Sequence, residues 1–194
     1  GNDRCGERLD RVAPLLFREQ TLLSEVMTFV AAELPFPLLG FDSDNDSVFM
    51  NETIKSWCKT AKVVFTRSRP YRKNDQAHVE QKNYTVVRQY LGYARIDNPD
   101  LAEPISALFT ETWRDYVNFF LPTLKLIKKE YVGTRVRRIY EPAARTPYAR
   151  LMTSQFGVNN KTKAALKAHF LTLNPFTLKT QLDAKLAQIG RAHV

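Results

Sequence analysis

The spacing of apolar residues divides the first third of the chain into alternating helices and strands. Residues 18–33 carry apolar side chains at helical spacing, and Pro35 ends that helix. The run PLLGF at 37–41 is almost continuously apolar, which predicts a buried strand of the kind found inside parallel sheets. An amphipathic helix over 47–61 and a β-branched strand over 62–68 follow. This order predicts an α/β fold.

Further helices are predicted beyond these strands. The polar, basic stretch at 69–76 reads as a loop, and the apolar positions within 77–92 predict a helix that Gly92 ends. A longer helix is expected over 98–122, where the last residue is a proline. The central part of the chain is therefore expected to be mostly helical.

The composition changes after Pro122. The stretch 124–152 is rich in Lys and Arg, carries interleaved tyrosines and has weak periodicity, so it predicts a basic linker or extended arm. Two short helices are expected at 161–171 and 176–188. The predicted division is a poorly defined segment at 1–17, a core at 18–122, the basic arm at 123–152 and a small helical region at 153–194.

Charge and cysteine content narrow the function classes. The 194 residues carry a formal net charge of +9, which suggests a polyanionic partner such as nucleic acid, although solubility alone is the simpler interpretation. The two cysteines, Cys5 and Cys58, have no metal-ligand spacing, and Cys58 is predicted to be a buried helical thiol. Neither a membrane-spanning run nor a signal-peptide pattern is visible, so we expect a protein of the reducing cytosol.

Three aspartates, Asp42, Asp44 and Asp46, follow the first predicted strand and admit three interpretations. A calcium loop of the EF-hand type would need Gly where Ser47 stands and Glu where Thr53 stands, so this interpretation is weak. A polar turn with helix caps is the plain structural interpretation. The third is a metal site, because carboxylates are hard oxygen ligands for divalent cations that clamp a phosphodiester.

Three longer sequence segments distinguish between these interpretations. The segments DSDNDSVFMN (42–51), VVFTRSRPYRKNDQAHVEQKN (63–83) and VVRQYLGY (86–93) together resemble the catalytic core of the DDE transposase and retroviral-integrase superfamily. They are most similar to bacterial insertion-sequence transposases. Residues 45 to 79 place 35 residues between Asp44 and Glu80, the separation that is common between the last two members of that family's catalytic triad.

The resemblance implies a fold, a chemistry and a cofactor. It implies an RNase H-like core over 18–122, followed by the basic arm and short C-terminal helices. It implies that Asp44 and Glu80 are catalytic ligands of Mg²⁺ or Mn²⁺, with Asp42 and Asp46 as turn, cap or outer residues. The implied reaction is metal-dependent nicking of a transposon end and transfer of the freed 3′-hydroxyl to target DNA.

The resemblance and the basic residues together predict DNA contacts. The partners would be transposon-end and target DNA, with the chain acting as a homo-oligomer in the bacterial cytoplasm at the nucleoid. Arginines interleaved with tyrosines suit both phosphate contact and stacking. The predicted DNA-binding residues are Arg67, Arg69, Tyr71, Arg72, Lys73, Lys82, Asn83, Arg88, Arg135, Arg137 and Arg138.

The sequence departs from the family pattern at two places. Asp46 and Val48 stand where the family usually has Gly and often Glu. The first Asp of the triad, which the family carries on a strand before the first helix, has no counterpart in an apolar strand here. The core is therefore expected to be incomplete, with its first strands missing, and the chain by itself inactive. The alternatives are a non-enzymatic DNA-binding or regulatory transposase fragment, and an RNase H-like nuclease without strand transfer.

Overall fold

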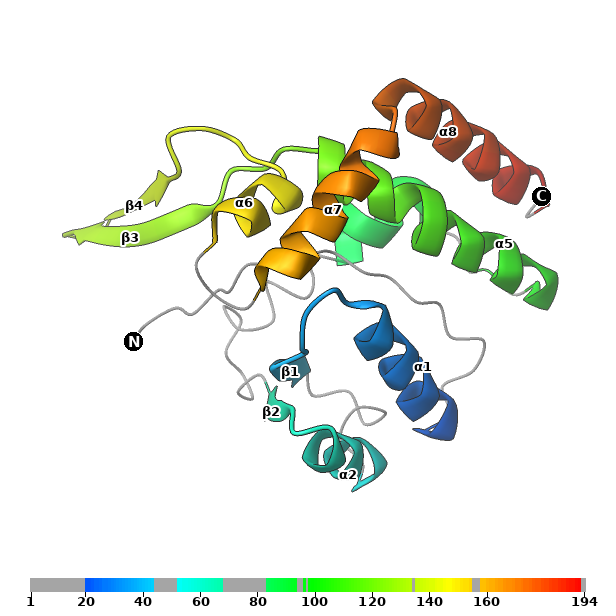
Figure 1. Cartoon of the computed structure of the whole chain (residues 1–194), viewed down its shortest axis with the longest axis horizontal. Helices are drawn as coiled ribbons and strands as arrows, with labels where there is room; N and C mark the ends of the chain where they lie inside the picture. The colour runs from blue at the N-terminus through cyan, green and yellow to red at the C-terminus, as the bar shows by residue number, and fades with distance from the viewer. Residues whose placement is uncertain are drawn as a thin grey trace.

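The computed structural model describes residues 20–43, 52–67, 83–93, 96, 98–133, 135–154 and 158–192. Within them the chain is a mixed structure in which helices predominate and two small sheets lie apart from each other (Figure 1). This composition is compatible with the expected α/β class.

The N-terminal unit alternates helix and strand as the sequence predicts. It consists of α1 (Gln20–Glu33), β1 (Gly40–Ser43), α2 (Glu52–Thr60) and β2 (Val64–Arg67). The two strands pair in parallel, with Phe41 opposite Phe65 and Ser43 opposite Arg67. The apolar run that predicted the first strand starts three residues too early, because regular pairing begins only at Gly40.

A small apolar core holds this unit together. Leu23 and Met27 of α1 pack with Ile54 and Cys58 of α2 and with Val63, and all five are buried. Cys58 is free and buried, as expected, and burial raises the pKa of its thiol. The helical spacing of α1 and α2 thus places one apolar stripe of each helix against the other.

Two contacts at the edges of this core fix the relative position of its elements. The indole Nε1 of Trp57 donates a hydrogen bond to Thr28 Oγ1 at 2.8 Å, which ties α2 to α1. On the sheet, the rings of Phe41 and Phe65 stack with centroids 5.9 Å apart. The N-terminal unit therefore has specific contacts between its helices and between its strands.

One long helical stretch forms the body of the rest of the molecule. It begins as a 3₁₀ turn, η2 (Pro99–Leu101), continues through α5 (Ala102–Ala107), and widens into π-helical turns at η3 (Leu108–Trp113) and η4 (Tyr116–Phe120). Asn98 caps its start by accepting a hydrogen bond from the Asp100 backbone N–H. The helix expected over 98–122 is therefore confirmed.

The helix expected over 77–92 is confirmed for the part that the structure describes. Residues 83–91 are helical, as η1 (Asn83–Arg88) and α4 (Gln89–Leu91). Gly92 follows with a φ of 75°, a left-handed conformation that glycine adopts without strain. Gly92 ends the helix as the sequence indicates.

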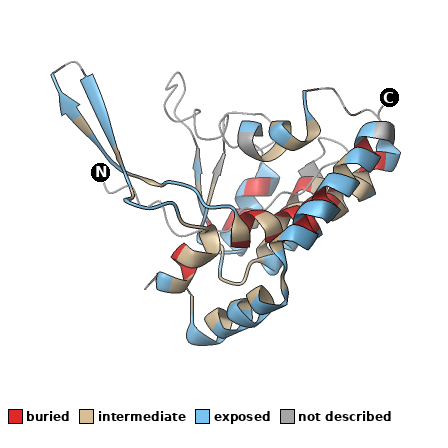
Figure 2. Cartoon of the chain, turned by 90° about the horizontal axis from the view of Figure 1, so that it is seen from above, coloured by how far each residue is buried: buried red, intermediate tan, exposed pale blue. Residues whose placement is uncertain are grey.

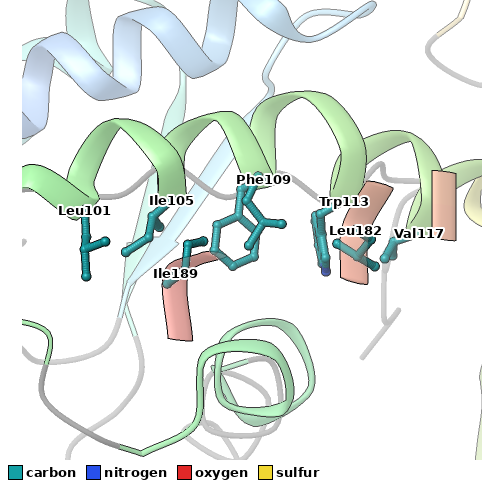
Figure 3. Close-up of a cluster of buried hydrophobic side chains, with 8 residues drawn as sticks. Leu101, Ile105, Phe109, Trp113, Val117, Leu182 and Ile189 are labelled. Atoms are coloured by element: carbon teal, nitrogen blue, oxygen red, sulfur yellow. The ribbon is translucent and has the colours of Figure 1, made fainter. Parts of the chain in front are cut away.

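The largest core lies between this long helical stretch and α8 (Pro175–Ala192). Figure 3 shows its side chains, which come from both helices and interleave. Trp113 is 1% exposed and makes edge-on ring contacts with Phe109 and Tyr90. The buried members are Leu101, Ile105, Leu108, Phe109, Trp113, Val117, Leu182 and Ile189.

The basic stretch after Pro122 forms a β-hairpin, which the sequence analysis did not predict. β3 (Leu126–Val132) and β4 (Arg135–Tyr140) pair antiparallel around a turn in which Gly133 has a φ of 60°. Weak periodicity suggested a linker or extended arm because both faces of this hairpin are exposed, so no apolar face alternates along it. The hairpin extends away from the helical body (Figures 1 and 2).

Two helices connect the hairpin to α8. They are α6 (Pro147–Thr153) and α7 (Asn160–Thr172). Thr146 and Asn159 cap them through side-chain oxygens that accept backbone hydrogen bonds. The rings of Phe119, Tyr148 and Phe170 stack on one another and join these helices to the end of the long helical stretch.

Candidate functional site

The first candidate site is the edge where the two parallel strands of the N-terminal unit end. Ser43 and Arg67 are the last paired residues of β1 and β2 and lie opposite each other. In open α/β sheets, ligands bind outside the carboxyl ends of the strands. The C-terminal ends of β1 and β2 therefore lie at the same edge of the sheet.

Most of the predicted catalytic and loop residues follow these two strands in the sequence and lie outside the described residues. For Arg67 and Asn83 the structure gives the backbone, in β2 and in η1, and not the side chain. The predicted site residues outside the described part are Asp44, Glu80, Arg69, Tyr71, Arg72, Lys73 and Lys82.

The Arg88 side chain contacts residues at the C-terminal end of its own helix. Its Nη1 donates to the carbonyl oxygen of Gly92 at 3.4 Å, and its guanidinium lies 5.4 Å from the ring centroid of Tyr93. These contacts stabilise the C-terminal end of the helix, where a cation is favoured. Tyr93 is itself largely exposed, so the pair is at the surface.

The second candidate site is the β3–β4 hairpin, which carries the remaining predicted DNA-binding residues. Arg135, Arg137 and Arg138 are exposed on β4. Lys128 and Lys129 are exposed on β3, directly opposite Ile139 and Arg138. The sequence analysis identified the β4 arginines and missed the β3 lysines, because only the strand pairing shows which cations share a face.

A buried arginine anchors the base of the hairpin to α6. Arg150 is 8% exposed, and its guanidinium donates to the Glu141 carboxylate, with Nη2–Oε2 at 2.8 Å and Nε–Oε2 at 3.1 Å. It also donates to the hydroxyl and carbonyl oxygens of Thr123. Hydrogen bonding by Arg150 lowers the pKa of Glu141. Charge-assisted bonds of this kind are among the stronger ones in proteins.

Backbone pairing at the same place closes the two ends of the hairpin. Thr123 and Arg145 exchange backbone hydrogen bonds of 3.0 and 3.1 Å. Glu141 N–H donates to the Lys125 carbonyl oxygen at 2.9 Å. The hairpin is therefore fixed at its base.

A polar cluster on the helical body is a feature that the sequence analysis missed. Asp115, which is buried, contacts His169 Nε2 through Oδ2 at 2.9 Å and Arg114 Nε through Oδ1 at 3.1 Å. Arg114 also lies 3.5 Å from a carboxylate oxygen of Glu33. The cluster joins α1, the long helical stretch and α7. Sequence spacing gave no signal for it, because Glu33, Asp115 and His169 are far apart in the chain.

An open groove of about 570 Å³ lies beside this cluster, between η3 and α8. Its charged lining is already paired: Lys185 Nζ contacts Glu111 at 2.6 Å, and Arg114 contacts Asp115. The ion pairs of the cluster and of the groove connect neighbouring helices. The charged side chains named here contact one another.

The described residues contain neither a metal-binding cluster nor a membrane-spanning helix. No group of three or more His, Cys, Asp or Glu side chains in that part of the chain is arranged to hold a metal ion. In the same residues, every helix is too short or too polar to cross a bilayer.

Comparison with known proteins gives one informative match. No protein-family model matches the chain. The chain is 43% identical over 129 residues to the uncharacterized protein y4rM of Sinorhizobium fredii (strain NBRC 101917 / NGR234). The match covers 66% of this chain and 37% of the relative, so the chain spans little more than a third of that protein's length.

Proposed function

We propose that this chain is part of a DDE-type transposase with an RNase H-like catalytic core, in which Asp44 and Glu80 bind divalent metal ions. The observation that carries the proposal is the parallel pairing of β1 and β2. Ser43 and Arg67 end their strands at the same sheet edge, so Asp44 and the basic residues after Arg67 would start there. One carboxylate and a set of phosphate-binding cations would thereby meet at one place.

The chemistry of the proposed ligands fits this activity. Ionised Asp and Glu offer hard oxygen atoms, which suit Mg²⁺ or Mn²⁺. Two such ions, when bound, would stabilise the attacking and leaving oxygens of a phosphodiester. The chain's own contribution is to hold Asp44 at the end of a paired strand and to neutralise phosphates with Arg67, Arg69 and their neighbours.

The proposal also includes the setting of the reaction. The substrates would be the transposon ends and target DNA, held by a homo-oligomer in the bacterial cytoplasm at the nucleoid. The formal net charge of +9 supports a DNA partner, because it favours association with a polyanion.

Metal binding by the isolated chain is the direct test. Mn²⁺ affinity would be measured by titration calorimetry for the wild-type chain, Asp44→Asn and Glu80→Gln, with Glu103→Gln as the matched control because Glu103 is exposed on α5. We expect both site variants to weaken binding by about tenfold or more, in line with losing a charged ligand. Equal affinity in the control and in Glu80→Gln would remove Glu80 from the site.

Nicking is the second test. A labelled duplex would be incubated with Mg²⁺ or Mn²⁺ and either this chain or, where an upstream reading frame exists, the chain extended through it. Metal-dependent nicking that Glu80→Gln abolishes supports the proposal. An extended chain that binds Mn²⁺ through Asp44 and Glu80 and still does not nick or join DNA would contradict it.

A non-enzymatic DNA-binding or regulatory fragment is the second candidate function. The observation that favours it is the cationic hairpin, which is anchored without any metal ligand. DNA binding that persists in EDTA, together with no nicking by either version of the chain, would support this function over the enzyme.

A further inference from the structure

The two faces of the β3–β4 hairpin carry equal net charge but differ in how their charged side chains are arranged. Residues directly opposite each other in an antiparallel pair point to the same face, and neighbours along a strand point to opposite faces. On one face Lys129 lies opposite Arg138 and Tyr131 lies opposite Val136. We call this the Lys129 face; every one of its four side chains is exposed.

The opposite face contains the hairpin's acidic residue. Glu130 lies opposite Arg137, and its carboxylate contacts Lys128 Nζ at 2.6 Å. We call this the Glu130 face. Of the three cations on this face, Lys128, Arg135 and Arg137, Lys128 is paired with Glu130. The Lys129 face has two cations, one aromatic and one aliphatic side chain, and no acidic residue.

The Lys129–Arg138 pair on this face does not stabilise the hairpin. Like charges directly opposite each other in a sheet repel, and a two-stranded hairpin in water is only marginally stable. Among the described residues, none of the ion pairs includes Lys129 or Arg138. Tyr131, 75% exposed, adds an unburied ring. These features suit a polyanion that neutralises both cations at once.

We propose that the Lys129 face of the hairpin binds double-stranded DNA, with the ribbon entering the major groove. The choice of DNA as the partner rests on the proposed transposase function. The major groove is wide enough for a two-stranded β-ribbon, and long side chains on its two strands reach phosphates on both sides. Lys129 and Arg138 come from different strands, so together they contact both sides of the groove.

The anchoring of the hairpin supports this placement. Arg150 and the Thr123–Arg145 bridge fix its base, and the ribbon of β3 and β4 extends away from the helical body (Figure 2). A ribbon held at one end presents a fixed face to its partner, which lowers the entropy lost on binding.

The test compares the two faces with equal loss of charge. Binding of the full chain to a short fluorescent duplex of arbitrary sequence would be followed by anisotropy in EDTA at several salt concentrations. The variant Lys129→Ala/Arg138→Ala removes two cations from the Lys129 face. The comparison variant Arg135→Ala/Arg137→Ala removes two from the Glu130 face and should lose less affinity. The control Lys161→Ala/Lys167→Ala removes two exposed cations from α7.

The expected results are quantitative. Each phosphate contact contributes about 0.9 to the slope of log K against log salt, so the Lys129-face variant loses about 2 from that slope and about tenfold or more in affinity at ~0.1 M salt. The control retains most of the slope, because it removes only screened long-range attraction. The thermal midpoint of the Lys129-face variant should not fall, since a repulsive pair is removed.

Three results would overturn the inference: an equal loss in the control, wild-type affinity in the Lys129-face variant, or tighter binding to the single strand of the same sequence than to the duplex. If the alanine variant misfolds, Lys129→Gln/Arg138→Gln keeps the aliphatic stems and replaces it. Binding in EDTA does not depend on the metal ligands, so Glu80→Gln separates the two proposals. If Glu80→Gln loses Mn²⁺ binding and still binds the duplex with wild-type affinity, the change affects only the catalytic site.

Discussion

The N-terminal β-α-β unit and the helical body with its hairpin are stabilised to different extents. The N-terminal unit has a small core between two helices and a two-stranded sheet. The helical body buries a larger set of apolar side chains along two long helices, with Trp113 at its centre. The proposed metal site lies on the edge of the smaller unit, and the proposed DNA-binding hairpin is anchored on the larger body. The two proposals thus concern regions whose apolar cores differ in size.

The largest expected effect comes from the core of the helical body. Trp113→Ala removes a side chain that is 1% exposed, and such truncations cost about 3–5 kcal/mol of unfolding free energy. Urea unfolding followed by circular dichroism would measure this loss. The matched variant is Ile54→Ala in the smaller core, expected to cost about 2–5 kcal/mol.

Hydrogen exchange on these two variants sharpens the comparison. Trp113→Ala should lower amide protection in α8 and the long helical stretch. Ile54→Ala should lower amide protection in α1 and α2 and leave the helical body protected. The Glu33–Arg114 ion pair between the two regions is partly exposed, and such pairs contribute little to stability. Equal loss of protection in both regions from either variant would show that the molecule unfolds as one unit.

The next largest effect concerns the hairpin base. Arg150→Met removes the charged donor to the partly exposed Glu141 carboxylate, while the Thr123 carbonyl keeps its bond from the Arg145 N–H. Losing such a charge-assisted hydrogen bond costs about 1.5–3 kcal/mol. Thermal unfolding measures the loss of stability, and the salt slope of DNA binding measures its effect on the hairpin. Arg135→Ala, at an exposed position, should change stability by less than about 0.5 kcal/mol and serves as the control.

A smaller effect is expected at the contact between α1 and α2. Trp57→Phe keeps a ring in place and removes the hydrogen bond from Nε1 to Thr28, which should cost about 1 kcal/mol. Chemical denaturation of the two proteins would measure this difference. Thr28→Val removes the other partner, and a double variant that costs no more than either single one would confirm that the hydrogen bond is the cause.

The smallest effect is a dependence on pH at the hairpin base. The pKa of Glu141 is lowered in the folded protein because Arg150 donates to its carboxylate. The stabilisation is therefore complete above the ordinary value of 4.5 and is lost as pH falls through the lowered value. Protection of the β3 and β4 amides should decline in that acidic range. Glu141→Gln should flatten the decline, and an unchanged profile in this variant would point to another group.

Helices and strands with a buried face could be predicted from sequence, and the hairpin could not. The helical spacing of Leu23 and Met27, and of Ile54 and Cys58, follows directly from their shared core. The β3–β4 residues share no core, so their pattern of exposure follows neither period. Pairing there depends on the turn at Gly133 and on the anchor at Arg150, whose partners are distant in the chain.

The candidate sites show the same limit. The sequence segments around Asp44 and Glu80 indicated these two residues. Both lie outside the described residues, so their roles remain predictions. Lys129 was overlooked, because its importance depends on which residue lies opposite it. The Asp115–His169 contact spans 54 positions and could not be read from local spacing.

Two backbone contacts at the base, the Thr123–Arg145 bridge and the Glu141–Lys125 hydrogen bond, make the hairpin an insert in the helical body. The Lys125 carbonyl accepts a hydrogen bond from the Glu141 N–H, so the chain leaves and re-enters the body at nearly the same point. A two-residue turn can join such neighbours. The strands between them could be deleted, lengthened or exchanged for another ribbon without displacing Thr123, Glu141 or Arg150. In evolutionary terms, this junction would let one helical body carry different ribbons by replacing a single insert.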